Sequence, residues 1–299
     1  MKKFNEIIEI EIQKILLLDI GAMQTNEAEN FEKLYNQGFL KIIGFEANKD
    51  QFLKLKNTEN KKYLNYCLGD GSERTLFITR YPGCSSLYEP NPIIINLFNS
   101  IGTEENGNFA VIEERKVKTI KLDEVKEIGK VDFMKIDTQG SELDILKGFK
   151  NKLTDILIIE SEVEFLELYK NQPMFSDINN FLYDNNFILH KFIDIIGRPF
   201  RPWIVNNNPA FPMSQVLSAD AIFLKDFSKP ELYSDIDLLK TSLILHEVYY
   251  SYDLCFFFLQ QYDKRNNLTI SKTYKDYIYK EEKINLKFMN LRMNIDKIN

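Results

Sequence analysis

Cysteine and histidine are scarce in this chain of 299 residues. It has three cysteines, Cys67, Cys84 and Cys255, and two histidines. The cysteines form no CxxC pair, and no group of cysteines and histidines has the spacing of metal ligands. Both a thiolate zinc site and a disulfide framework are therefore excluded. We expect three reduced thiols and no bound metal.

An excess of positive charge and long hydrophobic runs are also missing. Lys and Arg number 38 against 44 Asp and Glu, and the formal net charge is -6. Binding to phosphates depends on a surplus of Lys and Arg, so we expect no nucleic-acid partner. The longest strongly apolar run, residues 254–259, is too short to span a bilayer, and acids interrupt the apolar N-terminus. We expect no transmembrane segment, no signal peptide and a cytoplasmic location.

Short apolar runs alternate with segments of helical periodicity, which is typical of a mostly parallel sheet with helices on both faces. The predicted strands are residues 15–20, 41–46, 62–67, 131–137 and 156–160, with further strands at 75–79 and 111–121. Residues 187–192 and 219–224 lack a convincing helix between them, so we expect an antiparallel pair at the sheet edge. Asn48 is expected to cap a helix that buries Phe52, Leu53 and Leu55.

The pattern becomes purely helical from about Ser234. We predict an α/β sheet domain over residues 1–230 and a helical C-terminal extension over residues 231–299. A stripe of Tyr and Phe over residues 249–258 favours a core or a homodimer contact through these helices. From Lys264 onward the tail has nine Lys and Arg against four Asp and Glu. That excess indicates a solvated helix face or, alternatively, a membrane or partner contact.

The first predicted strand ends in Asp19-Ile20-Gly21-Ala22. In open α/β sheets ligands bind beyond the carboxyl ends of the strands, and a glycine there lets a ligand approach the backbone. Glu46 closes the second strand, where such folds use a carboxylate to accept hydrogen bonds from two ribose hydroxyls. No second glycine follows Gly21 as far as Asn26, although a pyrophosphate loop needs one. A nucleoside cofactor without phosphates therefore fits better than a dinucleotide, with a plain turn and an exposed acid as the alternative.

A second charged group follows the strand at residues 131–137. Lys135 and Asp137 lie at the mouth of this strand, and Glu142 lies in the first turn of the helix after it. Charged groups that end a buried strand cost free energy unless they are paired or used. The residues alone support equally an ion network that caps the helix and a functional site.

Eight segments, in order from about Ile15 to Leu224, resemble the FkbM family of methyltransferases. They are LLLDIGA, IIGFEAN, LGDGSERTLF, CSSLYEPN, VKTIKLDEV, DFMKIDTQGSELDILKG, IIESEVEFLELYKNQPMFSDI and LSADAIFL. KIDTQGSELDILKG and EVEFLELYKNQPMF are the most specific. The resemblance implies a class I methyltransferase sheet (Rossmann-like), S-adenosylmethionine as the donor, and transfer to a hydroxyl oxygen, often on a sugar or polyketide.

The resemblance also implies roles for individual residues. Those expected to bind the cofactor are Asp19, Gly21, Ala22, Glu46, Ala47, Leu68, Asp70 and Asp137. The first three would line its methionine end, Glu46 would hold the ribose, Leu68 and Asp70 would flank the adenine, and Asp137 would lie near the sulfonium. Ser85 and Ser86 are expected to close over the site. The chain departs from many members at Thr25, where they have Gly, and at Ala47, where they have Pro.

Methyl transfer to a hydroxyl needs a group that accepts the proton and a well-positioned oxygen. Asp137 is the first candidate base, with Lys135 as a charge stabiliser or as the partner of Asp137, and Glu142 as the next candidate. Glu160 and Glu162 follow the next strand and could also reach the cleft.

Segment 197–215 contains Arg198, Arg201 and Trp203, which suit a sugar face or an acidic group; the alternative is a hairpin packed on the sheet. The expected function is an S-adenosylmethionine-dependent O-methyltransferase that acts by in-line transfer on a hydroxyl of a sugar, glycan or related metabolite. The alternatives are a non-catalytic binding module whose donor loop at Thr25 is degenerate, and a methyltransferase for a lipid-linked or secondary-metabolite acceptor.

Overall fold

The computed structural model describes residues 2–23 and 29–280. It divides into two compact units, of which one comprises residues 15–27 and 40–232, and the other residues 1–14, 28–39 and 233–299. The predicted boundary after residue 230 lies near the start of the last of these segments. Residues 1–14 and 28–39, which we expected in the sheet domain, are instead grouped with the C-terminal helices.

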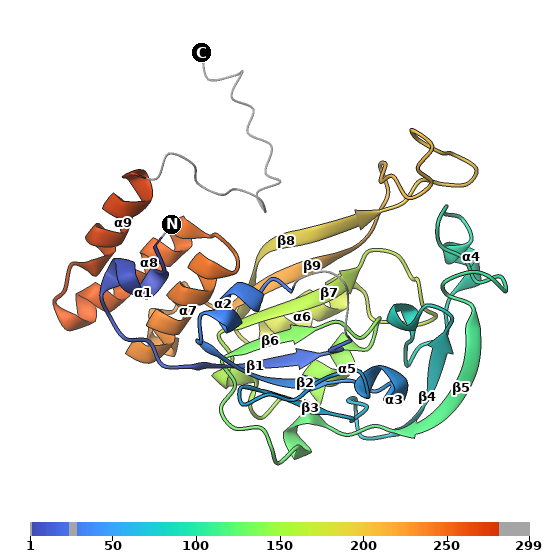
Figure 1. The fold of residues 1–299 in the computed structure, drawn as a ribbon, viewed down its shortest axis with the longest axis horizontal. Coiled ribbons are helices and arrows are strands. Elements are labelled where there is room, and N and C mark those ends of the chain that lie inside the picture. Colours follow the sequence, from blue (N-terminus) through green and yellow to red (C-terminus); the bar gives the residue numbers. More distant parts are fainter. Residues whose placement is uncertain (1, 24–28, 281–299) are drawn as a thin grey trace. The chain divides into compact units, whose positions relative to one another are not determined.

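The first unit contains a seven-stranded sheet in the order β3-β2-β1-β6-β7-β9-β8 (Figure 1). The strands are β1 (Ile15–Ile20), β2 (Leu40–Phe45), β3 (Lys61–Leu64), β6 (Phe133–Ile136), β7 (Ile158–Glu164), β8 (Phe187–Gly197) and β9 (Val216–Lys225). All neighbouring pairs are parallel except the two that involve β9. The predicted mostly parallel sheet and the antiparallel pair at its edge are confirmed, with β9 lying between β7 and the edge strand β8.

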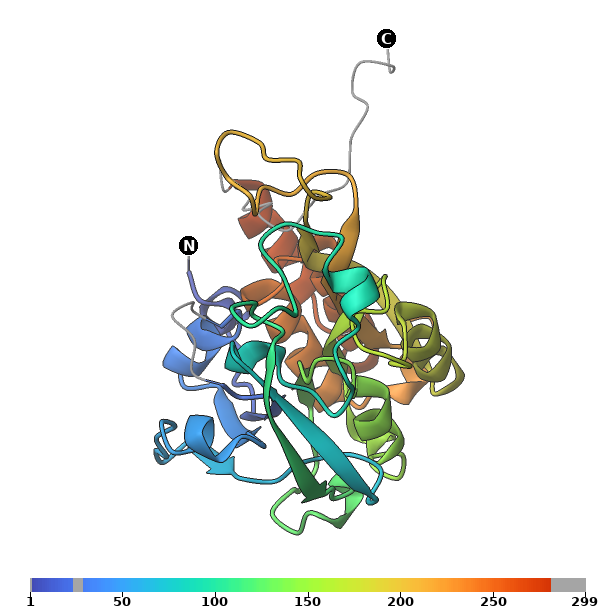
Figure 2. The same ribbon diagram turned by 90° about the vertical axis from the view of Figure 1, so that its right-hand side faces the viewer.

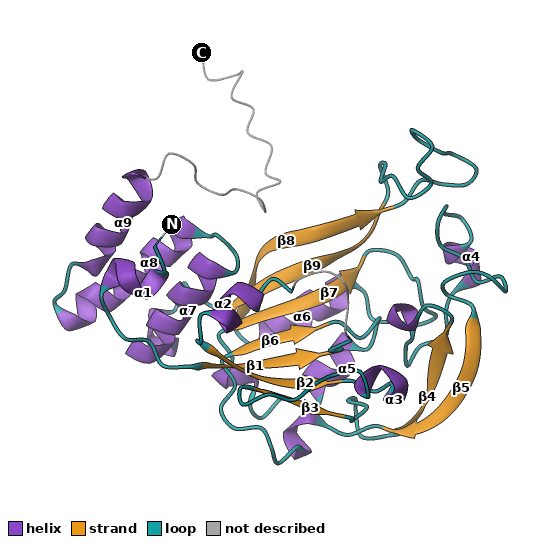
Figure 3. Ribbon diagram, in the orientation of Figure 1, coloured by secondary structure: helices purple, strands orange, loops and turns teal. Residues whose placement is uncertain are grey.

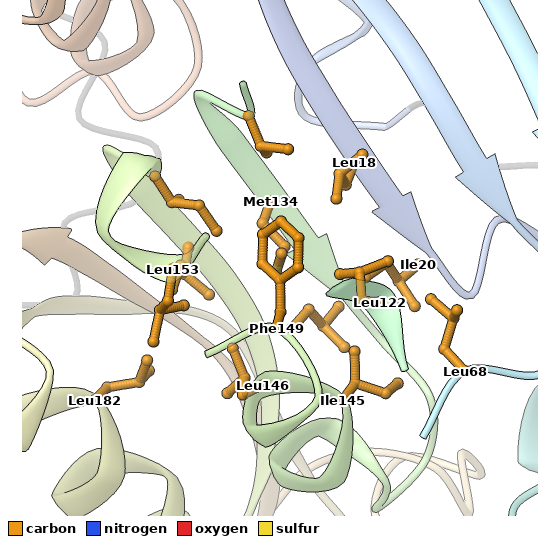
Figure 4. Packing of buried hydrophobic residues seen from close by; sticks show 14 of the residues in the cluster. Leu18, Ile20, Leu68, Leu122, Met134, Ile145, Leu146, Phe149, Leu153 and Leu182 are labelled. Carbon is orange, nitrogen blue, oxygen red and sulfur yellow. The ribbon is translucent and has the colours of Figure 1, made fainter. Parts of the chain in front are cut away.

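One face of this sheet is covered by α5 (Glu142–Lys147) and α6 (Phe175–Asp184). Leu18, Ile20 and Met134 point from the sheet toward Leu146 and Phe149 (Figure 4). All five side chains are buried, and burying such a side chain contributes roughly 1.5–3 kcal/mol. Because β1 and β6 lie in the middle of the sheet, this packing fixes the strand ends at which the candidate site residues lie.

The single-turn helix α3 (Lys49–Phe52) begins where the sequence predicts. The Asn48 side chain accepts hydrogen bonds from the main-chain nitrogens of Asp50 and Gln51, so the predicted cap is confirmed. The prediction that Leu53 points inward is wrong, because its side chain is 69% exposed. The helix ends at Phe52, and a single turn buries Gln51 instead.

The predicted strands near residues 75–79 and 111–121 are present as β4 (Glu73–Thr79) and β5 (Val111–Lys118), which pair in antiparallel fashion in a separate two-stranded sheet (Figure 3). The connection contains α4 (Pro92–Ile95), and short 3-10 turns lie at residues 82–84, 122–124, 153–155 and 230–232. A second apolar cluster, which includes Cys84, Ile95, Phe98 and Tyr169, anchors this connection. It therefore has a core of its own.

The second unit consists of α1 (Phe4–Ile8), α2 (Glu32–Asn36), α7 (Asp235–Glu247), α8 (Tyr252–Asn266) and α9 (Ile270–Lys280). Glu247 ties its segments together, accepting hydrogen bonds from the main-chain nitrogen of Phe4 and the side chain of Gln37, and pairing with Lys33 over 2.7 Å. Tyr249 and Phe258 of the aromatic stripe are fully buried. Their side chains thus form part of the unit's core, while the homodimer contact stays a prediction.

The scarce residues behave as their pattern indicates. Cys67, Cys84 and Cys255 are free thiols. His246 is buried, and its Nδ1 lies 3.0 Å from the hydroxyl of Tyr274. Within residues 2–23 and 29–280, no helix combines the length and apolar character needed to cross a membrane.

Candidate active site

The turn after β1 packs directly against the end of β6. The main-chain nitrogens of Gly21 and Ala22 both donate to the carbonyl oxygen of Phe45. Gly21 has φ +89°, and a Cβ built on it would overlap the carbonyl oxygen of Asp137. The structure thus gives this glycine a packing reason in addition to the predicted approach of a ligand.

Glu46 follows β2 at the same edge of the sheet. Its side chain is buried, and Oε1 accepts a hydrogen bond of 2.6 Å from the main-chain nitrogen of Asn48. Burial raises the pKa of Glu46 to about 7, and the negative charges of Asp19 and Asp137 add to the effect. The structure therefore brings three of the predicted donor residues into electrostatic contact.

The loop after Glu46 is fixed by Asn65. Its side-chain amide donates to the carbonyl oxygens of Glu46 and Ala47, over 2.7 and 3.3 Å. The backbone at both predicted donor positions is therefore held in place from the β3 side.

Leu68 and Asp70 belong to a turn next to the start of β4. Leu68 is buried and forms a β-bridge with Ile120. The Asp70 carboxylate accepts hydrogen bonds from Ser72 and Thr119, and the Ser72 hydroxyl in particular lowers its pKa. This carboxylate shapes its own turn, and the predicted adenine contact of both residues stays a prediction.

Glu142 closes the loop that follows β6. Its Oε1 accepts hydrogen bonds from the main-chain nitrogens of Thr138 and Gly140 and from the Thr138 hydroxyl. Oε2 is buried without a hydrogen-bond partner, and burial raises the pKa of Glu142 to about 7. The helix-capping alternative is thus supported for Glu142, although its partners are neutral groups rather than the expected ions.

Gln139 lies at the centre of this loop, and our sequence analysis missed it. Its Nε2 donates to Asp137 Oδ1 over 3.0 Å and to Glu162 Oε2 over 2.5 Å. Its Oε1 accepts from the Tyr169 hydroxyl over 2.9 Å, and its carbonyl oxygen accepts from Ser86. A φ of +58° turns the residue into this position. The Gln-Gly pair in the KIDTQGSE segment was the available signal, but we considered only charged side chains.

Lys135 lies in a row of acids across the sheet. In register it is the neighbour of Asp19 on β1 and of Glu160 on β7, and paired residues in a sheet share a face. Lys135 also opposes the rise in the pKa of Asp220, which burial and Glu160 bring to about 8. This placement favours charge neutralisation for Lys135.

Glu162 and Glu164 continue β7 past the predicted strand end. Burial raises the pKa of both carboxyls well above the ordinary value, and the charge of Asp137 contributes. Glu164 Oε2 is buried without a hydrogen-bond partner. We use the name Asp137 group for Asp137, Gln139 and Glu162, which hydrogen bonds join. Sequence analysis named Glu162 only as a residue that could reach the cleft.

The predicted acceptor residues fall into two sets. Ser86 joins the site, since its hydroxyl donates to Gln139 and accepts from the main-chain nitrogen of Tyr88. Ser85 is adjacent and accepts from the main-chain nitrogen of Thr79. Their position is consistent with a segment that closes over the site.

Arg198, Arg201 and Trp203 form the other set. Arg201 donates to the carbonyl oxygens of Phe98 and Ile101, and Arg198 donates to that of Gly197. The Trp203 side chain is 63% exposed. In the part of the chain that the structure describes, none of their hydrogen bonds reaches the Asp137 group, and their contact with an acceptor stays a prediction.

Two further expectations concern the donor loop and metals. Thr25 lies outside the described residues. Among residues 2–23 and 29–280, no three or more His, Cys, Asp and Glu side chains are grouped so that they could hold a metal ion. In the strand register Lys135 lies between the carboxylates of Asp19 and Glu160.

A comparison with curated proteins finds a methyltransferase. A curated relative, the hexuronic acid methyltransferase AglP of Haloferax volcanii, is 28% identical over 164 residues, which cover 50% of this chain and 61% of AglP. The chain thus spans less than two thirds of that relative.

Two solved structures have low similarity. The methyltransferase FkbM from Methylobacillus flagellatus KT is 11% identical with a TM-score of 0.35, and the match covers 71% of this chain and 43% of that one. The magnesium protoporphyrin IX methyltransferase of Synechocystis PCC 6803, solved with bound SAM, is 10% identical with a TM-score of 0.34, covering 71% of both chains. Neither similarity is high enough to carry an argument about this site.

The family comparison covers more of the chain. A model described as the methyltransferase FkbM domain matches residues 19–189, from the end of β1 to the start of β8. This range includes the donor positions and the Asp137 group, and it is more than half of the 299 residues. The chain therefore belongs to the FkbM methyltransferase family, with S-adenosylmethionine as its methyl donor.

Proposed function

We propose that this protein methylates a hydroxyl oxygen of a sugar, glycan or related metabolite. The observation that supports this best is the bridging of two carboxylates, Asp137 and Glu162, by the Gln139 amide at the carboxyl ends of β6 and β7. A hydroxyl is a poor nucleophile until its proton is accepted, and this arrangement offers two acceptors in one place. The name of the relative from Haloferax volcanii, a hexuronic acid methyltransferase, supports a sugar acceptor.

The negative charges at this edge of the sheet complement the positive charges of S-adenosylmethionine. The negative charges of Asp19 and Asp137 raise the pKa of Glu46 further, in addition to the larger effect of burial. A donor that has a positive sulfonium and an ammonium group would relieve this repulsion. When bound, the donor supplies an activated methyl group. Glu46 would accept hydrogen bonds from the ribose, and Asp19, Gly21 and Ala22 would line the methionine end.

The acceptor hydroxyl would lose its proton to Asp137. Gln139 occupies Oδ1 of Asp137, which leaves Oδ2 to accept that proton. Glu162 would act with Asp137 as a pair joined through the amide, because burial raises its pKa well above the ordinary value and so makes its carboxylate a stronger proton acceptor. Lys135, placed between acids, would limit the negative charge around the base. Glu142 would hold the loop rather than touch the acceptor.

Donor binding is the first experiment. Calorimetric titration with S-adenosylmethionine, S-adenosylhomocysteine and NAD should give binding of the first two and none of NAD. If none of the three binds, the proposal fails and the non-catalytic binding module takes its place.

The acceptor is then sought by mass spectrometry among hexuronic acids, neutral sugars and nucleotide sugars. A methylated product that survives mild alkaline hydrolysis is an ether and supports transfer to a hydroxyl. A product that alkali cleaves is a methyl ester and contradicts it. Asp137→Asn and Glu162→Gln should both form product at least about tenfold more slowly, because removing one general base costs on the order of 10²–10⁴ in rate.

The cytoplasmic location, the lack of a nucleic-acid partner and the homodimer through the C-terminal helices stay proposals of the same kind. Sedimentation equilibrium of the purified chain tests the last of these. A monomer at micromolar concentration contradicts it.

A further inference from the structure

Two segments of the sheet unit contain no charged residue at all. They are residues 91–103 and residues 202–215, in a chain of which 27% is Asp, Glu, Lys or Arg. The charged residues that flank them, Glu104 and Arg201, pair with each other over 3.2 Å. The two uncharged segments thus meet at a point where the adjoining charges neutralise each other.

Hydrogen bonds fasten the two segments side by side. The main-chain nitrogen of Arg201 donates to the carbonyl oxygen of Leu97, and Asn99 Nδ2 donates to that of Trp203. The rings of Phe98 and Phe200 lie 4.6 Å apart. Phe98 is buried in the second apolar cluster, so this assembly rests on a packed base.

The outer surface of this assembly is uncharged and exposes many large hydrophobic side chains beside the exposed Asn206, Asn207 and Asn208. We use the name apolar tip for its exposed hydrophobic side chains, which are Ile93, Leu97, Phe200, Trp203, Ile204, Phe211 and Met213. Exposure reaches 78% for Ile93. Figures 1 and 2 show the 198–215 connection extending past the ends of β8 and β9. Soluble proteins rarely expose so many large apolar side chains on two adjoining uncharged segments without a binding purpose.

The backbone of the tip satisfies part of its own hydrogen bonding. Val205 and Asn208 form a β-bridge, and Asn208 accepts hydrogen bonds from the main-chain nitrogens of Ala210 and Phe211. These groups would keep their hydrogen bonds when water is withdrawn, which lowers part of the cost of burying the loop.

We propose that the apolar tip inserts into the interfacial layer of a lipid bilayer. Insertion of this kind depends on buried apolar area, and Trp and other aromatic side chains prefer the boundary between headgroups and acyl chains. The lack of charge over both segments removes the main cost of entering that layer. It also commits the proposal to zwitterionic lipid, because the tip has no unpaired cation in its two segments to attract anionic headgroups. The inference does not depend on the proposed function.

The chain contains a built-in reporter, since Trp203 is its only tryptophan. The full chain is mixed with phosphatidylcholine vesicles while tryptophan emission is recorded. We expect a blue shift, and quenching when the acyl chains are brominated. No shift and no quenching, in a protein shown to be folded by circular dichroism, overturns the proposal.

A double variant, Ile204→Asp with Phe211→Asp, should lower the vesicle partition coefficient by about tenfold or more, because it removes two apolar anchors and adds two charges. The matched control is Leu53→Asp with Tyr183→Asp, which changes two apolar side chains outside the tip that are more exposed than Ile204 and Phe211, and it should leave partitioning unchanged. Equal losses in the two variants contradict a specific role for the tip.

Two other outcomes would assign the surface or the binding differently. A blue shift that grows with protein concentration in the absence of vesicles means that the tip contacts a second copy of the chain. Binding to vesicles that contain phosphatidylglycerol, with unchanged tryptophan emission, means that another part of the chain, such as the basic tail, makes the contact. Either result overturns insertion of the tip.

Discussion

The hydroxyl of Tyr169 donates a hydrogen bond of 2.9 Å to the side-chain oxygen of Gln139. Because Oε1 of the amide is occupied by this donor, its Nε2 must face the two carboxylates, which can only accept when ionised. A residue on the loop after β7 therefore helps to orient the amide at the centre of the candidate site, although the same hydroxyl also lies 3.0 Å from the carbonyl oxygen of Cys84.

Replacing Tyr169 by Phe should disturb the orientation of the Gln139 amide without removing it. We expect the methyl-transfer kcat to fall several-fold while the donor Kd stays unchanged, and the free energy of unfolding to fall by about 1–3 kcal/mol because buried acceptors lose their donor. Gln139→Leu should reduce kcat further, and the kcat of Gln139→Glu should also stay below that of the wild-type chain. Calorimetry of donor binding alongside steady-state kinetics makes the test. A change in donor Kd with constant kcat contradicts the positioning role.

Glu46 is the residue on which donor affinity should depend most. Glu46→Gln replaces the carboxylate that would accept hydrogen bonds from the ribose hydroxyls by a neutral amide. Hydrogen bonds to a charged group contribute about 1.5–3 kcal/mol. We expect the Kd for S-adenosylhomocysteine to rise by roughly 10–100-fold. Asp50→Asn, at an exposed position in the first turn of α3, is the control and should bind normally. An unchanged Kd in Glu46→Gln would remove the ribose assignment.

The buried carboxyls predict how stability depends on pH. Burial raises the pKa of Glu46 and Glu142 to about 7 and that of Asp220 to about 8. Ionising them costs free energy in the folded state only, so their contribution is full below the ordinary pKa near 4 and is lost as the pH rises through 7 and 8. Without ligand, the free energy of unfolding should fall by roughly 2–4 kcal/mol between pH 6.5 and 8.5.

Thermal melts across that range measure this dependence. Burial lowers the pKa of His246 to about 4, which destabilises the fold at acid pH, so the comparison stays above pH 6.5. Glu46→Gln should flatten the dependence in part. A melting temperature that rises with pH over this interval contradicts the raised pKa values.

Two glycines with the same backbone conformation offer a matched pair. Gly21 and Gly38 have φ +89° and +87°, but an added Cβ would strike Asp137 at the first position and meets nothing within 4 Å at the second. Gly38→Ala should cost about 1–2 kcal/mol from backbone strain alone. Gly21→Ala should cost clearly more and should weaken donor binding, which denaturant unfolding and calorimetry can measure. Equal losses of stability would contradict the packing role of Gly21.

Much of the sheet could be predicted because its strands are short and apolar. β1 and β6 are short apolar runs that fit only a buried strand. Asn48 caps its helix through hydrogen bonds to residues two and three positions later in the chain. Strand order also predicted Asp19, Glu46 and Asp137 at one edge of the sheet, where the charges of Asp19 and Asp137 act on Glu46. These are properties that neighbours in the chain decide.

What could not be predicted depends on pairing between distant segments. β7 continues through Glu162 and Glu164 because β9 pairs with it there, and a run of acids does not indicate a strand. Gln139 acquires its role from Tyr169 and Ser86, which lie on other loops. Phe4 joins the C-terminal helices through Glu247, 243 residues away. A local sequence pattern cannot predict contacts between residues that are far apart in the chain.

Because β9 lies between β7 and β8, the Asp137 group and the 198–215 connection lie at different places in the sheet and are under different constraints on sequence change. The residues around Asp137 emerge from the central strands, where a change in length would break the packing on both sides. The 198–215 connection joins two strands at the margin of the sheet, and loops of this kind tolerate insertion and exchange at little cost. Mutations can therefore change the binding partner of the 198–215 connection without changing the residues of the Asp137 group.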